Sequence, residues 1–462
     1  MVKTMTEGKE WKQIFLFALP LMVGNLLQQL YNTVDGVIVG NYVSADALAS
    51  VGTCAPMTML FIAIAIGLSA GCAIVVSQYF GAKNLDELRR AVSTSIILLV
   101  AIGVVLSVVG VIAARPILVY VLNVDDYYLE AAVTYFSIYA IGLVFQFAYN
   151  IFAAVLRSLG DSNATLYFLL VSSVTNVVLD LIFIRVFEWG VAGAAIATVI
   201  SQALSAVVCV VYMFKKHPVL RSEKGQFRFY SDKFRLALRL GIPTMFSQCV
   251  VSFGHIAIQR LINTMELTQP GFMAGCTAAT RIENFILIPV FAFNMAMATF
   301  TGQNIGAGRL DRVKRGLWRA ELMGCICCIT IGMTAFFLAP QLVHLFGLDV
   351  STGLAYGVEY VRFIAPLFTI FCFYLLLGGL IQGAGDVLWS TTATISSLVF
   401  RTIIAYVLAY LTPVGYSAAW VSVPLGWTWA LLILVFRYRS GRWTTKAIAN
   451  KASAKLSPEA DA

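Results

Sequence analysis

Long apolar runs recur along almost the whole chain, and each reaches the roughly 20 residues that a helix needs to cross a bilayer. Hydrophobic residues make up 60% of the 462 positions and charged residues only 12%, about half the charged share of an average soluble domain. Barrel strands are short and alternate polar with apolar residues, a pattern that this chain lacks. We therefore predict an all-α integral membrane protein with twelve transmembrane helices.

The basic residues gather in alternate loops, which predicts how the chain crosses the membrane. Short loops rich in Lys and Arg stay in the cytoplasm, and an even number of spans leaves both termini on one side. We expect a multi-pass membrane protein with both termini cytoplasmic. These loops also explain the formal charge of +9, so we expect no nucleic-acid partner. The basic segments are the N-terminus, 83–90, Arg157, 215–239, 309–319 and the stretch from Arg437 onward.

The two halves of the chain repeat one another. Gly160-Asp161 recurs 225 positions later as Gly385-Asp386, and Pro20 matches Pro243 at a slightly shorter offset. Six spans in each half give the halves the same orientation, which predicts a parallel repeat of two six-helix bundles. We place the lobes at 1–214 and 236–440, a polar cytoplasmic linker at 215–235, and a disordered cytoplasmic tail at 441–462.

Carboxylates deep in apolar segments distinguish the first half from the second. A carboxylate in hydrocarbon is costly, and it usually persists because an ion, a proton or a substrate needs it. Asn176 and Asp180 are four residues apart, so they share one face of a helix. At the repeat positions of Asn176 and Asp180 the second half carries Arg401 and Ala405. The candidate oxygen-bearing residues of the first half are Asp35, Asn150, Asn176, Asp180 and Thr198.

The sequence resembles the multidrug and toxic compound extrusion (MATE) transporters, most closely their bacterial DinF/MepA-like branch. The resemblance covers about residues 10–440. It is carried by Pro20 with Asp35-Gly36, Gln78-Tyr-Phe-Gly81-Ala82, Leu156-Arg-Ser-Leu-Gly160-Asp161, Asn176-Val-Val-Leu-Asp180, Gly190-Val-Ala-Gly193-Ala-Ala195 and Thr198.

We expect a monomer in a bacterial plasma (inner) membrane. The resemblance implies a V-shaped, twelve-helix antiporter of two lobes that exports organic and often cationic, lipophilic compounds in exchange for Na⁺ or H⁺. It also implies that Asp35, Asn150, Asn176, Asp180 and Thr198 form the ion-coupling site. Asp35, Asn176, Asp180 and Thr198 are then the candidate Na⁺ ligands. We expect no cofactor beyond the coupling ion, and the bilayer and small-molecule substrates as the partners of the chain.

The residues themselves leave the coupling ion open. Carboxylate, amide and hydroxyl oxygens suit a hard cation, whereas two carboxylates in a low dielectric also favour proton binding. A third interpretation is that Asn150 and Thr198 only hydrogen-bond neighbouring helices. Pro20 permits a kink in the first helix, which either bends during transport or is static.

The second half buries a different polar set. His255, Arg260, Arg281, Glu283 and Arg401 lie in its apolar segments. We predict that Glu283 pairs with Arg401 or Arg260 on another helix, either as a structural ion pair or as a contact with substrate. The arginines also keep open an alternative function, flipping of a lipid-linked oligosaccharide, because they are able to bind a pyrophosphate.

The remaining reactive residues predict no enzyme. The histidines, residues 217, 255 and 344, are far apart in sequence, and no ATP-binding glycine loop occurs. Nine cysteines fall within apolar segments, including Cys325, Cys327 and Cys328. We expect them to be small buried side chains without a metal, because no His or carboxylate accompanies them closely and one helix cannot direct all three at one point.

Overall fold

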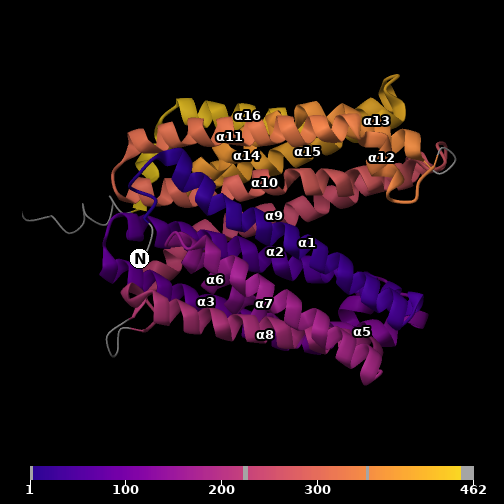
Figure 1. Cartoon of the computed structure of the whole chain (residues 1–462), viewed down its shortest axis with the longest axis horizontal. Helices are drawn as coiled ribbons and strands as arrows, with labels where there is room; N and C mark the ends of the chain where they lie inside the picture. The colour runs from indigo at the N-terminus through magenta and orange to yellow at the C-terminus, as the bar shows by residue number, and fades with distance from the viewer. Residues whose placement is uncertain (1–3, 222–226, 350–352, 449–462) are drawn as a thin grey trace, which may run out of the picture. The chain divides into compact units, whose positions relative to one another are not determined.

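The computed structural model describes residues 4–221, 227–349 and 353–448, and within them the chain is helical and has no β-strand (Figure 1). The helices of the first half are α1 (Glu10–Tyr42), α2 (Ala45–Gly81), α3 (Leu85–Ile112), α4 (Ala114–Pro116), α5 (Asp126–Ile141), α6 (Leu143–Ser158), α7 (Ser162–Asp180) and α8 (Gly190–Lys216). Those of the second half are α9 (Ser231–Glu266), α10 (Phe272–Gly306), α11 (Leu310–Phe337), α12 (Ala339–His344), α13 (Leu354–Ile364), α14 (Phe368–Gly383), α15 (Val387–Leu411) and α16 (Ala418–Arg439).

The spans agree with the sequence prediction. In the described part of the chain, eleven helical segments are long and apolar enough to cross a membrane, and α5 with α6 makes a twelfth if the bent pair is one span. The pair bends by 44° at Gly142, where the backbone N–H of Val144 donates to Ser107 Oγ at 3.2 Å. A serine on a neighbouring helix thus satisfies a backbone group at the break, as an apolar medium requires.

The chain divides into two compact units whose limits differ from the predicted lobes. The first unit is Val23–Met245 with Thr4, and the second is Met5–Met22 with the described residues from Phe246 onward. The divisions fall inside α1 and α9, two residues after Pro20 and Pro243. The reason is packing, because Ile14, Phe17 and Ala18 of α1 are buried in the core of the second unit. A count of spans along the chain does not reveal that the first part of a helix packs in one bundle and the rest of it in the other.

The predicted tail is ordered at its beginning. Arg442–Lys446 form a 3₁₀ turn in which Trp443 is buried. Its ring stacks on Tyr438 at 5.6 Å between centroids, and its indole N–H donates to the Tyr438 carbonyl at 3.1 Å. The prediction of disorder is therefore wrong for this turn, and residues 449–462 lie outside the described part of the chain.

Within the first unit, glycines bring α9 against α2. A Cβ built on Gly71 would lie 2.3 Å from the backbone nitrogen of Gly241, and one on Gly67 would lie 2.3 Å from Cα of Met245. These obstacles are backbone atoms, which a rotamer change cannot remove. Small residues are what allow membrane helices to approach this closely.

We expect Gly71→Ala to destabilise the protein, whereas Gly52→Ala on the same helix should not. A methyl group at 71 meets the α9 backbone, and overpacking of this kind costs about 1–3 kcal/mol. Gly52 has open space around it, so alanine there should gain helix propensity of up to about 1 kcal/mol. Thermal unfolding of both variants in one detergent checks this, and equal midpoints would refute the close α2–α9 packing.

The beginnings of α1 and α9 are held by ion pairs of opposite polarity. In the second unit Glu10 pairs with Arg315 at 3.1 Å and Arg312 at 3.5 Å. In the first unit Lys233 pairs with Glu87 and donates to Tyr79 Oη at 3.0 Å. Lys233 is the repeat position of Glu10 (10 + 223), and Arg312 is that of Glu87 (87 + 225). The same ion pair is therefore present at equivalent positions of both units, but the acidic and basic partners have exchanged places.

The turn between α6 and α7 also recurs in both units. Gly160 and Gly385 have φ of 89° and 88°, the left-handed region that favours glycine. Asp161 caps α7 through the Ala164 N–H at 3.2 Å and accepts from Tyr212 and His217 at 3.0 Å each. Its counterpart Asp386 instead pairs with Arg437 at 2.6 Å.

Asp161 predicts acid-sensitive stability. Burial by itself raises the pKa of this carboxyl. The hydrogen bonds from His217, the Ala164 N–H and Tyr212 outweigh that effect, together with the positive charge of Lys216. The pKa of Asp161 is therefore lowered below its usual value. A depressed pKa in the folded state means that the stabilisation is complete above the unfolded pKa of about 3.9 and is lost as pH falls through the folded value. Asp161→Asn should cost about 1–3 kcal/mol at pH 7.

Unfolding midpoints measured from pH 7 to pH 3 check this prediction. The difference in unfolding midpoint between the wild type and Asp161→Asn should become smaller as the pH approaches 3. Asp86→Asn is the control, because that carboxylate is 78% exposed and its contact with Arg89 is 3.8 Å long. A difference that stays constant with pH would contradict the role of the Asp161 charge.

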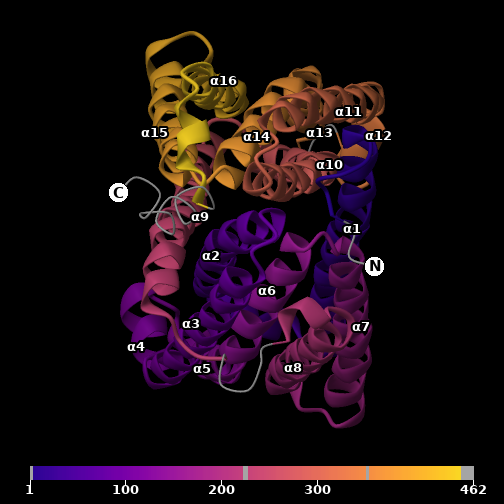
Figure 2. The same ribbon diagram turned by 90° about the vertical axis from the view of Figure 1, so that its left-hand side faces the viewer.

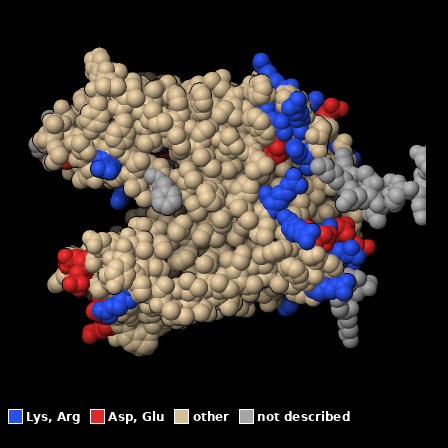
Figure 3. Space-filling model, turned by 180° about the vertical axis from the view of Figure 1, so that it is seen from behind, with Lys and Arg blue, Asp and Glu red and all other residues tan. Residues whose placement is uncertain are grey.

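The surface of each unit is divided between apolar and charged regions. In Figure 3 most of the visible Lys and Arg lie near one end of the helices of each unit, and the long middle shows almost only other residues. This is the distribution expected of helices that span a bilayer with their basic loops on one side.

Candidate functional site

Two of the predicted site residues occupy one buried position on α7, and a third faces them from α8. The two helices lie side by side (Figure 2). Asn176 and Asp180 are both fully buried. The amide of Asn176 fits best with its nitrogen donating to Asp180 Oδ2 at 2.8 Å and its oxygen accepting from the Thr198 N–H at 3.2 Å. The Thr198 hydroxyl donates to the Ala194 carbonyl at 3.0 Å.

The last turns of α1 pack at the same place. Asp35 lies in α1, but its side chain is outside the described part of the structure. Ile38, three residues later, is buried in one apolar cluster with Ile184 and Ala194. The helical turn that carries Asp35 therefore lies beside the end of α7 and the beginning of α8.

Asn150 lies at a different level. Its side-chain N–H donates to the Gln146 carbonyl of its own helix at 2.8 Å. One turn joins the end of α6 to the start of α7. Asn150 is eight residues before this turn, counted from the end of α6, and Asn176 is fourteen residues after the start of α7. At 1.5 Å per residue the two side chains are about 9 Å apart along the helices. The structure thus groups Asn176, Asp180 and Thr198, and leaves Asn150 nearer the other end.

The backbone changes directly after Asp180. Residues Leu181–Val186 form a π-helical turn that follows α7 without a break. Wider turns of this kind occur often at functional sites, because they shift the register of the side chains that follow. Ile184 in this turn supplies part of the apolar cluster around the polar group.

The arrangement suits binding of a small cation. Asp180 supplies a formal charge, and Asn176 and Thr198 supply uncharged oxygens, on the helix ends that also carry Ile184 and Ala194 of the apolar cluster. Oxygen ligands of this kind bind hard cations, and a carboxylate is also able to take up a proton. Pro20, which the sequence analysis assigned to bending, is buried within α1, two residues before the division between the units.

The polar residues of the second unit are only partly brought together. Glu283 of α10 accepts from the Tyr360 hydroxyl at 2.8 Å, and it lies within the electrostatic influence of Arg401 on α15. Among the described residues, no salt bridge of 4.0 Å or less joins Glu283 to Arg401 or Arg260. Arg260 and Arg281 are exposed, and the His255 side chain is outside the described part.

One buried polar cluster was missed in the sequence. Glu321 of α11 lies with Cys325 and with Cys372 of α14, and their ligand atoms are all within 4.8 Å of one another. The expectation that no carboxylate accompanies the cysteines is therefore wrong. The signal was available in part, because Glu321, Cys325 and Cys328 follow the i, i+4, i+7 spacing of one helix face.

Comparison with known proteins agrees with this architecture. A model of the MatE family matches residues 20–182 and 243–407. The chain belongs to the MatE family. The two matched stretches begin 223 and end 225 residues apart, so the MatE match itself follows the duplication. Together with the apolar helices, membership shows a multi-pass membrane transporter.

Relatives and solved structures of the MatE family match almost the full chain. The probable multidrug resistance protein YoeA of Bacillus subtilis is 28% identical over 459 residues, covering 95% of each chain. The probable multidrug resistance protein NorM of Thermotoga maritima is 23% identical and covers 96% of this chain and 95% of its own. A MATE crystal structure in complex with MaL6 superposes with a TM-score of 0.88 at 24% identity, covering 96% of this chain and 98% of that one. The predicted MATE fold is thereby confirmed.

Proposed function

We propose that this protein exports organic, often cationic and lipophilic compounds by antiport with Na⁺ or H⁺. The observation that carries the proposal is the fully buried Asp180, hydrogen-bonded through Asn176 towards Thr198. A buried ionisable group within membrane-spanning helices is costly unless the protein uses it. The names of relatives such as YoeA support drug-like cargo. Carriage, and not catalysis, is then the activity of the chain.

The proposal gives each residue a role. Asp180 carries the charge that the coupling ion neutralises, and Asn176 and Thr198 supply oxygens. Asp35 completes the charge from α1, and Asn150 lines the route toward the other end. The α1 helix, with Pro20 in its first third, connects ion binding to the shape of the substrate space. We further propose that the protein is a monomer in a bacterial inner membrane. Its termini would be cytoplasmic, as the basic loops favour.

Transport by purified protein in vesicles tests the proposal. We expect uptake of a fluorescent organic cation driven by a Na⁺ gradient at fixed pH, or by a pH gradient without Na⁺. The gradient that drives uptake identifies the coupling ion. Two results together would overturn antiport in favour of the flippase. Neither gradient would drive uptake of the organic cation, and labelled lipid-linked sugar head groups would become exposed on the opposite leaflet.

A further inference from the structure

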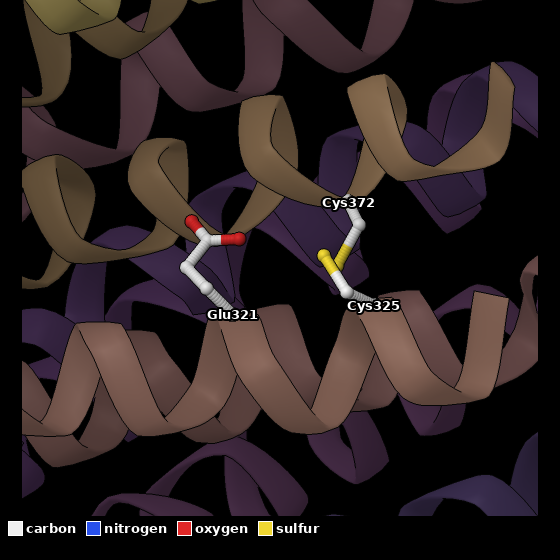
Figure 4. Close-up of side chains that lie close together, drawn as sticks. All are labelled: Glu321, Cys325 and Cys372. Atoms are coloured by element: carbon white, nitrogen blue, oxygen red, sulfur yellow. The ribbon is translucent and has the colours of Figure 1, made fainter. Parts of the chain in front are cut away.

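Glu321 and two cysteines of the second unit meet between α11 and α14. Figure 4 shows the carboxylate of Glu321 and the thiol of Cys325 projecting from one helix, and the thiol of Cys372 reaching them from the other. Cys372 also interacts with the thiol of Cys328, one turn after Cys325. One oxygen and up to three sulfur donors therefore converge from two helices.

Two of the three side chains are buried and Cys325 is partly buried, and the carboxylate is incompletely bonded. Glu321 is 6% exposed and Cys372 is fully buried. Among the residues that the structure describes, Oε2 of Glu321 has no hydrogen-bond partner. A buried carboxylate oxygen without a partner is costly in an apolar environment. A ligand that binds this oxygen would remove that cost.

The helix backbone makes room for the donors. A Cβ on Gly324 would lie 2.4 Å from Sγ of Cys372. Glycine at this position lets the Cys372 thiol lie directly against α11, beside the Cys325 thiol (Figure 4). Any larger residue at 324 would push the sulfur out of reach of the other donors.

We infer that Glu321, Cys325 and Cys372 bind a thiophilic divalent cation of the Zn²⁺ and Cd²⁺ class. Thiolate and carboxylate ligands select such ions over Na⁺, Mg²⁺ or Ca²⁺, which prefer oxygen alone. Tetrahedral Zn²⁺ with bonds of about 2.3 Å holds its ligand atoms about 3.8 Å apart. The donors already lie within 4.8 Å of one another, so only a small contraction is needed.

Binding of the ion releases protons from the thiols. Each thiol releases its proton to solvent as its metal–sulfur bond forms, and the carboxylate binds as the anion. Two thiolates and one carboxylate around a divalent ion leave a net charge of −1 when the fourth ligand is neutral, either a water or the protonated thiol of Cys328. The ion would join α11 to α14 at a place separate from Asp180 and its neighbours, so the inference does not depend on the proposed antiport.

Cadmium binding to the purified, reduced full-length protein tests the inference. We expect one Cd²⁺ per chain, with the ultraviolet sulfur-to-cadmium charge-transfer band of thiolate ligands and a higher unfolding temperature. Cys372→Ala and Cys325→Ser should each lose the band, and Glu321→Gln should weaken binding. Cys327→Ser is the matched control, because Cys327 lies on the same helix but outside the cluster.

The outcomes separate the possibilities cleanly. A band that persists in Cys372→Ala, or one that disappears in Cys327→Ser, would overturn the assignment. So would absence of cadmium binding in the wild-type protein when its cysteines remain titratable after denaturation. If the alanine variant folds poorly, Glu321→Gln decides the question, since it keeps the size of the side chain and removes the charge.

Discussion

Asp180→Asn is expected to reduce gradient-driven export strongly in reconstituted vesicles while leaving the amount of folded protein unchanged. The substitution removes the buried negative charge that would attract the coupling ion. It keeps an oxygen that accepts from the Asn176 amide, as Asp180 Oδ2 does at 2.8 Å. We expect the gradient-driven component to fall by about 5- to 150-fold, the range of typical coupling between binding sites.

A carboxylate outside the site serves as the control. Glu130→Gln removes one negative charge from the same unit, but this side chain is 74% exposed and pairs with Arg115 on the surface. Exposed pairs contribute little, so its transport should match the wild type. Stabilisation of the purified protein by Na⁺ or by protonation should also vanish in Asp180→Asn. Gradient-driven transport at the wild-type rate in that variant would refute the role of Asp180.

Much of the fold follows from local features of the sequence. In lipid every backbone N–H and C=O must be satisfied within the structure, so a long apolar run has few choices other than a helix. The recurrence of Gly160-Asp161 at Gly385-Asp386 predicted a duplication, and the backbone at both glycines is nearly identical. Asn176 and Asp180 were predictable as a pair because their four-residue spacing places them on one helix face.

What the sequence did not reveal are contacts between segments far apart in the chain. Met5–Met22 joins the second unit because of the neighbours that bury Phe17 and Ala18, and no local pattern encodes those neighbours. Cys372 meets Glu321 although the two residues are 51 positions apart in the sequence (372 − 321). Helix periodicity predicts which face a side chain occupies, but not which helix lies opposite.

Lys233→Glu is expected to reduce the yield and stability of the folded protein strongly, and the double variant Glu87→Lys/Lys233→Glu to restore most of the loss. Lys233 is 7% exposed and Glu87 is 18% exposed. Breaking a buried pair by removing one partner costs about 3–5 kcal/mol. The single variant also places the new carboxylate beside Asp232, which contacts Lys233 at 3.0 Å. Thermal unfolding of all three proteins in one detergent measures the effect.

Arg90→Glu separates burial from charge in this experiment. Arg90 contacts the same Glu87 at 3.1 Å but is 49% exposed, so its reversal should cost about 1 kcal/mol or less. Equal losses in Arg90→Glu and Lys233→Glu would show that only the net charge near Glu87 matters. Failure of the double variant to recover would contradict the ion pair as the source of stability. Because the equivalent pair, Glu10 with Arg312, has the opposite polarity, exchanging the beginnings of α1 and α9 would bring like charges together. The reversed polarity therefore favours docking of each helix beginning on its own unit.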